Sequence, residues 1–515
     1  MFRKPASGYR LIFGYLGIFL TLIGAICLLP LLMLFAYPHE AGVAPDFIIP
    51  GVSAVAGGIG LSFLIFKRDK TQLGKFQDSA LLVLVWFAAI LVGAVPFALR
   101  GLFTSDHGGM MKFSDAVFES TSGYSASGLT LFKFDESLPG YHIFTTYRSL
   151  LLFFGGIGLV LIVTSALSDR YGLKLYTAEG HNDKLVPNLV KSARLILAIY
   201  VGYIILGMLS YFFIGGMELF DAFNHSIAAV ATGGFSTKAG GIPEIIAAGG
   251  NNSIGVPVSA VAINVTSVIL MILGATNFML HLFIFRGKFK AIFKDCEIRF
   301  FALVTLIFVP LFFVAIFSEG INGLTSLGEG TFLYFTSITT TGFSTINDIK
   351  TLGEASIILS VVMMCIGGGM GSTAGAIKQY RLVLAFKSLY WAIRDRLAPS
   401  NKVYPHTVFR LGVDKEVARE EVYESYGYMV VYIAALLAGT ILIVIQGRGQ
   451  IQGADALFEF ASALSGTGLS VGVTGFSTSI NWILIVGMFI GRLEILPVYF
   501  AFFRLFRDVF RKETI

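Results

Sequence analysis

The chain has 515 residues, of which 55% are hydrophobic and only 14% are charged, whereas soluble domains usually carry about 25% charged residues. Apolar runs of about 20 residues recur along it and are long enough to cross a hydrocarbon core of about 30 Å. This composition predicts a multi-pass membrane protein and excludes a soluble globular one.

The net charge of +6 does not indicate a nucleic-acid partner, because most of the positive charge lies in alternate loops. Thirty of the 38 Lys and Arg residues fall in the segments 1–10, 67–77, 170–194, 286–299, 378–419 and 504–512. This pattern follows the positive-inside rule and predicts that both termini are cytoplasmic.

The first 76 residues predict a two-helix appendage. Apolar segments at 10–36 and 47–66 are joined by a short loop at 37–46, and a basic run at 67–70 ends the second. The first segment is too long for the apolar part of a signal peptide and has no small-residue cleavage pattern. We therefore expect it to remain as a membrane helix.

From residue 77 one pattern occurs four times: an apolar helix, a short half-apolar helix, a hydroxyl-rich stretch with a glycine, and a second apolar helix. The predicted repeats are 77–175, 176–292, 293–398 and 399–515. First apolar helices are expected near 79–99, 195–214, 301–317 and 427–445, and second ones near 141–167, 258–285, 355–385 and 480–503. With the N-terminal pair this gives ten spans. The predicted fold class is an all-α membrane protein with four pseudo-symmetric helix–pore loop–helix repeats.

The hydroxyl-rich stretch is the feature that defines each repeat. Its copies are Ser125-Ala126-Ser127-Gly128-Leu129-Thr130, Ala231-Thr232-Gly233-Gly234-Phe235-Ser236, Thr339-Thr340-Thr341-Gly342-Phe343-Ser344 and Ser465-Gly466-Thr467-Gly468-Leu469-Ser470. An acidic residue precedes the fourth-position glycine by 13 positions in every copy: Asp115, Asp221, Glu329 and Asp455. The intervening segment is too short to span the bilayer and too apolar for an outer loop. We predict a re-entrant half-helix whose positive N-terminal end is capped by the acid.

Irregular backbone at membrane depth needs protein or water around it, so we expect the four stretches to meet around one axis. Their side chains include no acid–base pair and no set of transition-metal ligands, so the useful atoms are expected to be backbone carbonyls. A ring of carbonyls can replace the hydration shell of an alkali cation, and glycine permits the backbone angles. The predicted lining residues are Ala126, Ser127, Gly128, Thr232, Gly233, Gly234, Thr340, Thr341, Gly342, Gly466, Thr467 and Gly468. Close packing of helices through small residues is the alternative, which four copies at a fixed spacing disfavour.

A second unusual segment, 367–375, places five glycines inside the second apolar helix of repeat three. It mimics a dinucleotide fingerprint, but no strand precedes it and it lies inside a predicted membrane span. A Walker A loop would need a lysine within the glycine-rich segment, and none appears until Lys378. Packing of helices through glycine is a further alternative. We interpret the segment as an unwound loop inside the membrane, with weaker counterparts at 155–158 and 274–277.

Arg492 lies within the last predicted span, where a charge costs at least about 2.5–3.5 kcal/mol and indicates a functional role. The alternative is an ion pair with Glu494 or Glu459 that only fixes helix packing. His225, in the second half-helix, is a candidate proton carrier or a packing residue.

These motifs resemble the Trk/Ktr/HKT superfamily of potassium transporters, and the extra N-terminal pair resembles its Trk-type membrane subunit. The resemblance covers residues 78–515 by motif. It implies that the four stretches form a selectivity filter in a central ion pore, and that glycine at position 128 favours potassium. Ala126 departs from the hydroxyl-rich pattern, which matters little for a site built from backbone. The resemblance further implies a gate beneath the filter, formed by Gly367, Gly368, Gly369, Gly371, Ser372, Thr373, Gly375, Lys378 and Arg492.

By the same resemblance we expect potassium uptake across the cytoplasmic (inner) membrane of a prokaryote. We expect a homodimer in contact with membrane lipid, no covalently bound cofactor, and control by a cytosolic RCK/TrkA-like nucleotide-binding ring. Nucleotide would act only through that partner, because this chain has no nucleotide fold. A sodium-coupled Ktr-type or sodium-permeable transporter is the alternative. A membrane-embedded enzyme or a receptor is more remote, since no span carries a cluster of His, Asp and Glu. Whether flux is channel-like or a proton- or sodium-coupled symport stays open.

Overall fold

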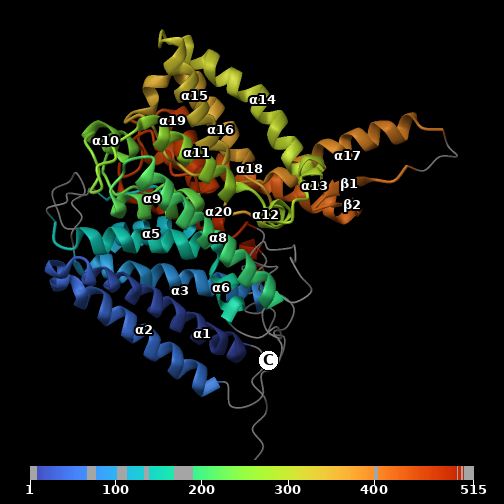
Figure 1. Cartoon of the computed structure of the whole chain (residues 1–515). Coiled ribbons are helices and arrows are strands. Elements are labelled where there is room, and N and C mark those ends of the chain that lie inside the picture. The colour runs from blue at the N-terminus through green and yellow to red at the C-terminus, as the bar shows by residue number, and fades with distance from the viewer. Residues whose placement is uncertain are drawn as a thin grey trace, which may run out of the picture.

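A computed structural model describes residues 9–65, 77–100, 113–132, 138–166, 189–399 and 404–495, together with 497–499, 501 and 503. Predictions on the remaining residues, among them most of the basic clusters at 1–10, 67–77, 170–194 and 504–512, lie outside the described residues. The described chain is a bundle of helices with one small β hairpin (Figure 1).

Six helices are long and apolar enough to cross a membrane. They are α1 (Tyr9–Leu28, continued by the 3-10 helix η1, Leu29–Phe35), α2 (Ala44–Ile65), α3 (Gln77–Arg100), α8 (Leu189–Phe213), α14 (Cys296–Phe317) and α18 (Arg419–Gln446). These helices match the predicted N-terminal pair and the first apolar helix of each repeat.

Four shorter helices precede the hydroxyl-rich stretches. They are α4 (Phe113–Ser125), α9 (Leu219–Val230), α15 (Gly323–Ile338) and α19 (Gly453–Ser465). With at most 16 residues and a rise of about 1.5 Å per residue, none reaches across a hydrocarbon core of about 30 Å. Four short helices thus lie where the sequence analysis predicts half-helices.

The second apolar segment is interrupted in every repeat. The pieces are α5 (Tyr141–Ile157) with α6 (Leu159–Ala166), α11 (Ala260–Ala275) with α12 (Phe278–Phe285), α16 (Glu354–Ile366) with α17 (Gln379–Leu397), and α20 (Thr478–Arg492). The α11–α12 pair is bent by 108°, and after α20 the chain turns at Glu494 and Ile495, which both have positive φ. Four of the ten predicted spans are thus not continuous helices. The interruption after Arg492 itself contains no glycine, although Gly491 stands directly before Arg492.

The prediction of an all-α fold requires one correction. Strands β1 (Thr407–Arg410) and β2 (Val413–Glu416) pair in antiparallel register, Thr407 with Glu416 and Arg410 with Val413. The two turn residues, Leu411 and Gly412, both have positive φ, as the tight turns that suit hairpin twist require. The remaining short elements are η2 (Pro38–Val43), α10 (Gly241–Ala248), α13 (Phe289–Lys294) and η3 (Ile349–Leu352).

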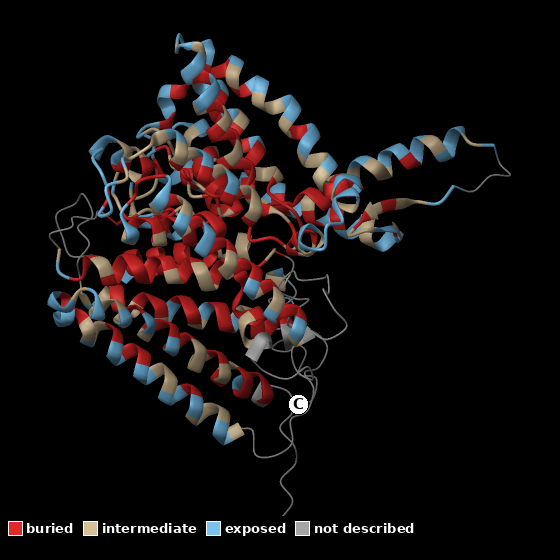
Figure 2. Cartoon of the chain, in the orientation of Figure 1, coloured by how far each residue is buried: buried red, intermediate tan, exposed pale blue. Residues whose placement is uncertain are grey.

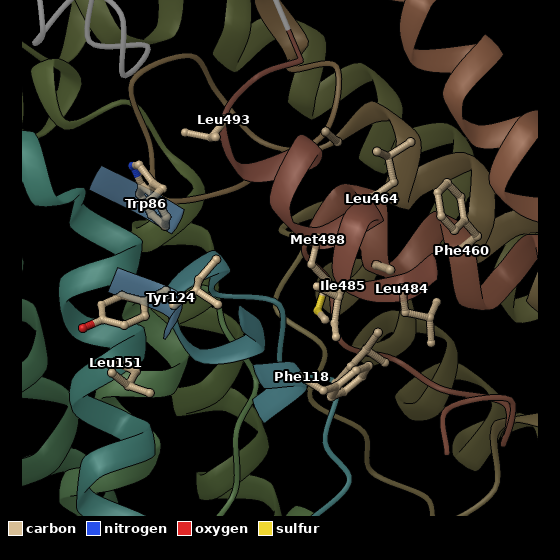
Figure 3. Close-up of a cluster of buried hydrophobic side chains, with 14 of the residues drawn as sticks. Trp86, Phe118, Tyr124, Leu151, Phe460, Leu464, Leu484, Ile485, Met488 and Leu493 are labelled. Carbon is tan, nitrogen blue, oxygen red and sulfur yellow. The ribbon is translucent and has the colours of Figure 1, made fainter. Parts of the chain in front are cut away.

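The first and fourth repeats pack against each other although they are far apart in the sequence. Helix α4 contacts α20, and their side chains share one buried cluster with α3, α5 and α19 (Figure 3). The labelled members are Trp86, Phe118, Tyr124, Leu151, Phe460, Leu464, Leu484, Ile485, Met488 and Leu493. The N-terminal pair lies outside this arrangement, with α1 packed on α3 (Figure 1).

The outer helices carry many exposed residues (Figure 2), and a large share of these are large and apolar. Phe63 on α2 and Leu306 on α14 are both 74% exposed. Exposed apolar surface of this extent marks contact with lipid or with a partner protein. It supports the membrane assignment made from composition.

Candidate functional site

The four hydroxyl-rich stretches adopt one backbone conformation. The amide of the residue before each glycine donates to the carbonyl oxygen five residues earlier, at 2.9 Å in every copy: Ser127 to Ser122, Gly233 to Ala228, Thr341 to Thr336 and Thr467 to Ser462. One residue further back the backbone is left-handed, with φ of 53° at Ala126, 50° at Thr232, 52° at Thr340 and 70° at Gly466. A left-handed conformation costs a non-glycine residue about 1–2 kcal/mol, and such strain gathers at functional sites.

Each stretch abuts the next, and the fourth abuts the first. A side chain on Gly128 would overlap the carbonyl oxygen of Gly233, and one on Gly234 that of Thr341. Gly342 has the same relation to Thr467, and Gly468 to Ser127. All four glycines also have positive φ. The stretches therefore come together in a closed ring that leaves no room for a Cβ at these positions.

A cavity lies on each side of this ring. The first, the inner cavity, is lined by the start of two stretches and by the glycine-rich segment: Ser125, Ala126, Ser465, Gly466, residues 371–376, Lys378 and Arg492. The second, the outer cavity, is lined by Gly128, Gly234 and Gly342 and by residues that follow them. The ring thus lies between the inner cavity and the outer cavity.

Three of the four predicted helix caps stand at the helix start. Asp115, Asp221 and Asp455 each occupy the third position of their helix, where a negative charge favours the positive end of the dipole. The prediction for Glu329 is wrong. Helix α15 begins earlier, and Asn322 caps it by accepting from the amide of Thr325 at 2.9 Å. Glu329 instead accepts a hydrogen bond from the Thr345 hydroxyl.

Three of the stretches are each braced from behind by a buried polar residue. The sequence analysis did not identify these residues as a set. Each stands nine positions before the glycine and binds the hydroxyl two positions after it. Glu119 accepts from Thr130 Oγ1 at 2.9 Å, Glu459 accepts from Ser470 Oγ at 2.7 Å, and His225 Nε2 lies 3.0 Å from Ser236 Oγ. Repeat three has Leu333 at this position. The fixed spacing of the two glutamates was the signal that could have revealed this brace.

Arg148 links the first two stretches beside the outer cavity. Its side chain is 2% exposed and its Nε lies 2.6 Å from Glu119 Oε1. It also donates to the Ser236 carbonyl at 3.1 Å, and its guanidinium carbon sits 3.9 Å from the centre of the Phe235 ring. Its sequence neighbours give no sign of this role.

The glycine-rich segment is an unwound loop, as predicted, and it lies against the ring. Gly375 donates its amide to Thr340 Oγ1 at 3.0 Å, and the Thr373 hydroxyl donates to the carbonyls of Gly274 at 2.8 Å and Val230 at 3.0 Å. Thr373 is 1% exposed. Thr232 Oγ1 also donates to Thr373 Oγ1 at 3.1 Å, so the loop beside the inner cavity contacts stretches two and three directly.

Arg492 reaches the same loop from α20. It donates to the Thr373 carbonyl at 3.1 Å, to the Gly156 carbonyl at 2.7 Å and to the Gly155 carbonyl. These oxygens belong to two of the helix breaks described above. Of the two acids considered as partners for Arg492, Glu494 lies 2.8 Å from Lys378 and 2.6 Å from Arg381, and Glu459 braces stretch four.

A single carboxylate connects the β hairpin to the loop. One oxygen of Glu297 accepts from Arg410 Nε at 3.0 Å, and the other accepts from the Met370 amide at 3.0 Å. Both charged side chains are at most 5% exposed. Arg410 also lies over the Tyr380 ring, 4.1 Å from its centre. A displacement of the hairpin would therefore reach the loop through Glu297.

Long apolar helices arranged around a closed backbone ring, with a cavity on each side, define a membrane transport protein rather than an enzyme. The family model of TrkH, described as "Cation transport protein", matches residues 64–509, and the chain belongs to this family.

Named relatives align over almost the whole chain. An uncharacterized cation transporter of Methanocaldococcus jannaschii is 27% identical over 514 residues, covering 99% of this chain and 98% of that protein. The Trk system potassium uptake protein TrkH of Escherichia coli (strain K12) is 29% identical over 530 residues, covering 98% of this chain and all of the relative. The crystal structure of the potassium transporter TrkH from Vibrio parahaemolyticus superimposes with a TM-score of 0.78 at 23% identity, covering 96% and 98% of the two chains. This last likeness supports the fold.

Proposed function

We propose that this chain takes up potassium through a selectivity filter formed by the four hydroxyl-rich stretches. The observation that carries the proposal is the repeated backbone: one hydrogen-bond pattern and one set of left-handed residues in four stretches that abut in a ring. Relatives described as potassium uptake proteins support the choice of ion. The location that follows is the cytoplasmic membrane of a prokaryote, with both termini on the cytoplasmic side.

In this proposal the carbonyl oxygens of the residues at and before the four glycines take the place of water around the ion. The side chains at these positions are small enough not to block the pore axis. Glu119, Glu459 and His225 hold the outer half of their stretches in place through the hydroxyls of Thr130, Ser470 and Ser236. His225 then acts by bracing the filter, which favours the packing role over that of a proton carrier.

The loop at 367–375 is proposed to close the inner side of the filter, with Arg492 as its lock. A guanidinium that donates to carbonyls on two elements stabilises the closed position, and its positive charge raises the barrier to a cation. Five glycines give the loop small barriers to rearrangement. Opening requires the contact of Thr373 with Thr232 in stretch two and that of Gly375 with Thr340 in stretch three to break.

Control of this gate is proposed to come from a cytosolic nucleotide-sensing ring. The β hairpin and α17 project from the bundle (Figure 1), and Glu297 ties the hairpin to Met370. A pull-down in mild detergent should recover such a partner, and its nucleotide should change flux. Absence of both effects would contradict this part of the proposal.

A homodimer is proposed through α17. Five apolar residues at helical spacing along it are more than half exposed: Phe386, Leu389, Tyr390, Ile393 and Leu397. A stripe of this kind on a projecting helix needs a partner or a lipid surface to cover it.

Rubidium and sodium flux into liposomes tests the central proposal. The wild-type chain should pass rubidium in preference to sodium, and Gly342→Ser should reduce that preference because the added side chain meets the Thr467 carbonyl. Equal passage of both ions by the wild type would favour the sodium-permeable alternative. A lack of alkali-cation flux, even in an Arg492→Ala background that removes the lock, would overturn the proposal.

A further inference from the structure

Two histidines and a buried glutamate converge at the end of the bundle opposite the β hairpin. His39 and Glu40 lie on the 3-10 helix η2, between the two N-terminal helices, and His142 lies in the first turn of α5. One ligand atom from each of the three side chains falls within 4.8 Å of the others. Two of the seven histidines in the chain thus meet where segments about a hundred residues apart come together.

Two of these residues are held in place before any ligand arrives. Glu40 accepts hydrogen bonds from the amides of His142 and Ile143, both at 3.1 Å, and His142 Nδ1 lies 2.7 Å from its Oε1. Tyr37 stacks on the His142 ring with 3.6 Å between centres and 12° between planes. A carboxylate oxygen and an imidazole nitrogen are thus held side by side at this place.

The hydrogen bonds from the first turn of α5 explain why Glu40 is buried beside the His142 amide. They give no role to the His39 side chain. The His39 side chain is exposed, and among the described residues it has ring contacts but no hydrogen-bond partner. With His39 as a third ligand beside the Glu40 carboxylate and the His142 imidazole, the set contains two nitrogen atoms and one oxygen atom.

We propose that His39, Glu40 and His142 bind a divalent transition-metal ion, with Zn²⁺ as the best match. Imidazole nitrogen with carboxylate suits zinc, whereas Ca²⁺ and Mg²⁺ prefer sites made of oxygen alone. Zinc ligands at about 2.0–2.1 Å stand roughly 3.3 Å apart around the ion, so His39 must move inward, and its exposed position allows this. The three protein ligands leave a fourth position for water.

The ion would fasten the N-terminal pair to α5. The far end of α5 carries Gly155 and Gly156, whose carbonyls accept from Arg492. A metal ion on the expected outer face therefore restrains α5, and the other end of α5 contacts Arg492 at the inner cavity. The binding site itself does not depend on the proposed transport function.

Binding is measured on the purified full-length chain in detergent after removal of metals by a chelator. Co²⁺ serves as a spectroscopic probe of low-coordinate nitrogen and oxygen ligation, and Zn²⁺ is titrated calorimetrically. The wild type should bind one ion per chain. His39→Ala should weaken binding at least about tenfold, the lower limit seen when even an outer-shell partner of a metal site is removed. His142→Gln should weaken it at least as much.

His39→Ala is the decisive variant because the side chain is exposed and its loss leaves the α5 cap intact. His406→Gln is the matched control, since His406 also pairs with a carboxylate, Asp395, at the opposite end of the bundle; it should bind metal like the wild type. Failure of the wild type to bind one ion per chain, or equal affinity in His39→Ala, would overturn the proposal. Neither result bears on rubidium flux.

Discussion

Replacing Glu297 with Gln should release the β hairpin and disturb the glycine-rich loop. The glutamate gives one oxygen to Arg410 and the other to the Met370 amide. Glutamine has the same shape but only one oxygen, so either Arg410 or the Met370 amide faces an NH2 group instead of an acceptor. The Arg410 side chain, which is 5% exposed, then loses the charge of Glu297 but keeps the attraction of the Asp295 carboxylate.

Removal of one partner from a buried ion pair costs about 3–5 kcal/mol. Every 1.4 kcal/mol is about a tenfold change in an equilibrium constant, so undocking of the hairpin should become at least about a hundredfold more favourable. Hydrogen–deuterium exchange at residues 407–416 should rise accordingly. Flux through liposomes should lose part of its dependence on the cytosolic partner, because the hairpin no longer acts on Met370.

Two further variants separate charge loss from loss of the loop contact. Lys415→Ala breaks the pair between the hairpin and Glu421 on α18, whose side chains are 41% and 28% exposed, and such pairs contribute about 0–1 kcal/mol, so exchange should barely change. Glu297→Met combined with Arg410→Met removes both charges and should recover much of the stability, while the Met370 contact remains lost. Unchanged exchange and an unchanged thermal midpoint in Glu297→Gln would refute the reasoning.

Three other predictions concern the ring, the lock and the dimer. Gly234→Ala should abolish flux and lower the thermal midpoint, because its methyl group meets the Thr341 carbonyl at a left-handed position, whereas Gly328→Ala, in an open position on α15, should raise stability by about 0.5–1 kcal/mol. Arg492→Ala should increase rubidium flux at equal expression, and unchanged or lower flux would count against its role as the lock. Leu389→Lys should convert the dimer to a monomer in light scattering after size-exclusion chromatography; a persistent dimer would place the interface elsewhere.

The positions of the four hydroxyl-rich stretches could be predicted because the distances between their residues along the chain are fixed. Acid and glycine stand 13 residues apart in every copy, and a hydroxyl-rich stretch that ends a short helix needs glycine wherever another backbone approaches. Apolar length alone identified the six continuous membrane helices. The unwound loop in repeat three was predictable for the same reason, since five glycines within nine residues disfavour a helix.

Contacts between distant segments were not predictable from such spacing. The break after Arg492 has no glycine and follows from the pairing of Glu494 with Lys378 and Arg381, more than a hundred residues away. The role of Glu329 was misjudged because Asn322, seven residues and about two turns before it, caps the start of the helix. Arg148 and Glu297 were assigned no role, since a buried charge is explained only by the partners that tertiary structure brings to it. The sequence by itself determined where the four stretches and their glycines lie. Only the tertiary structure decided what holds them, because hydrogen bonds and ion pairs between segments depend on distance in space and leave no period in the chain.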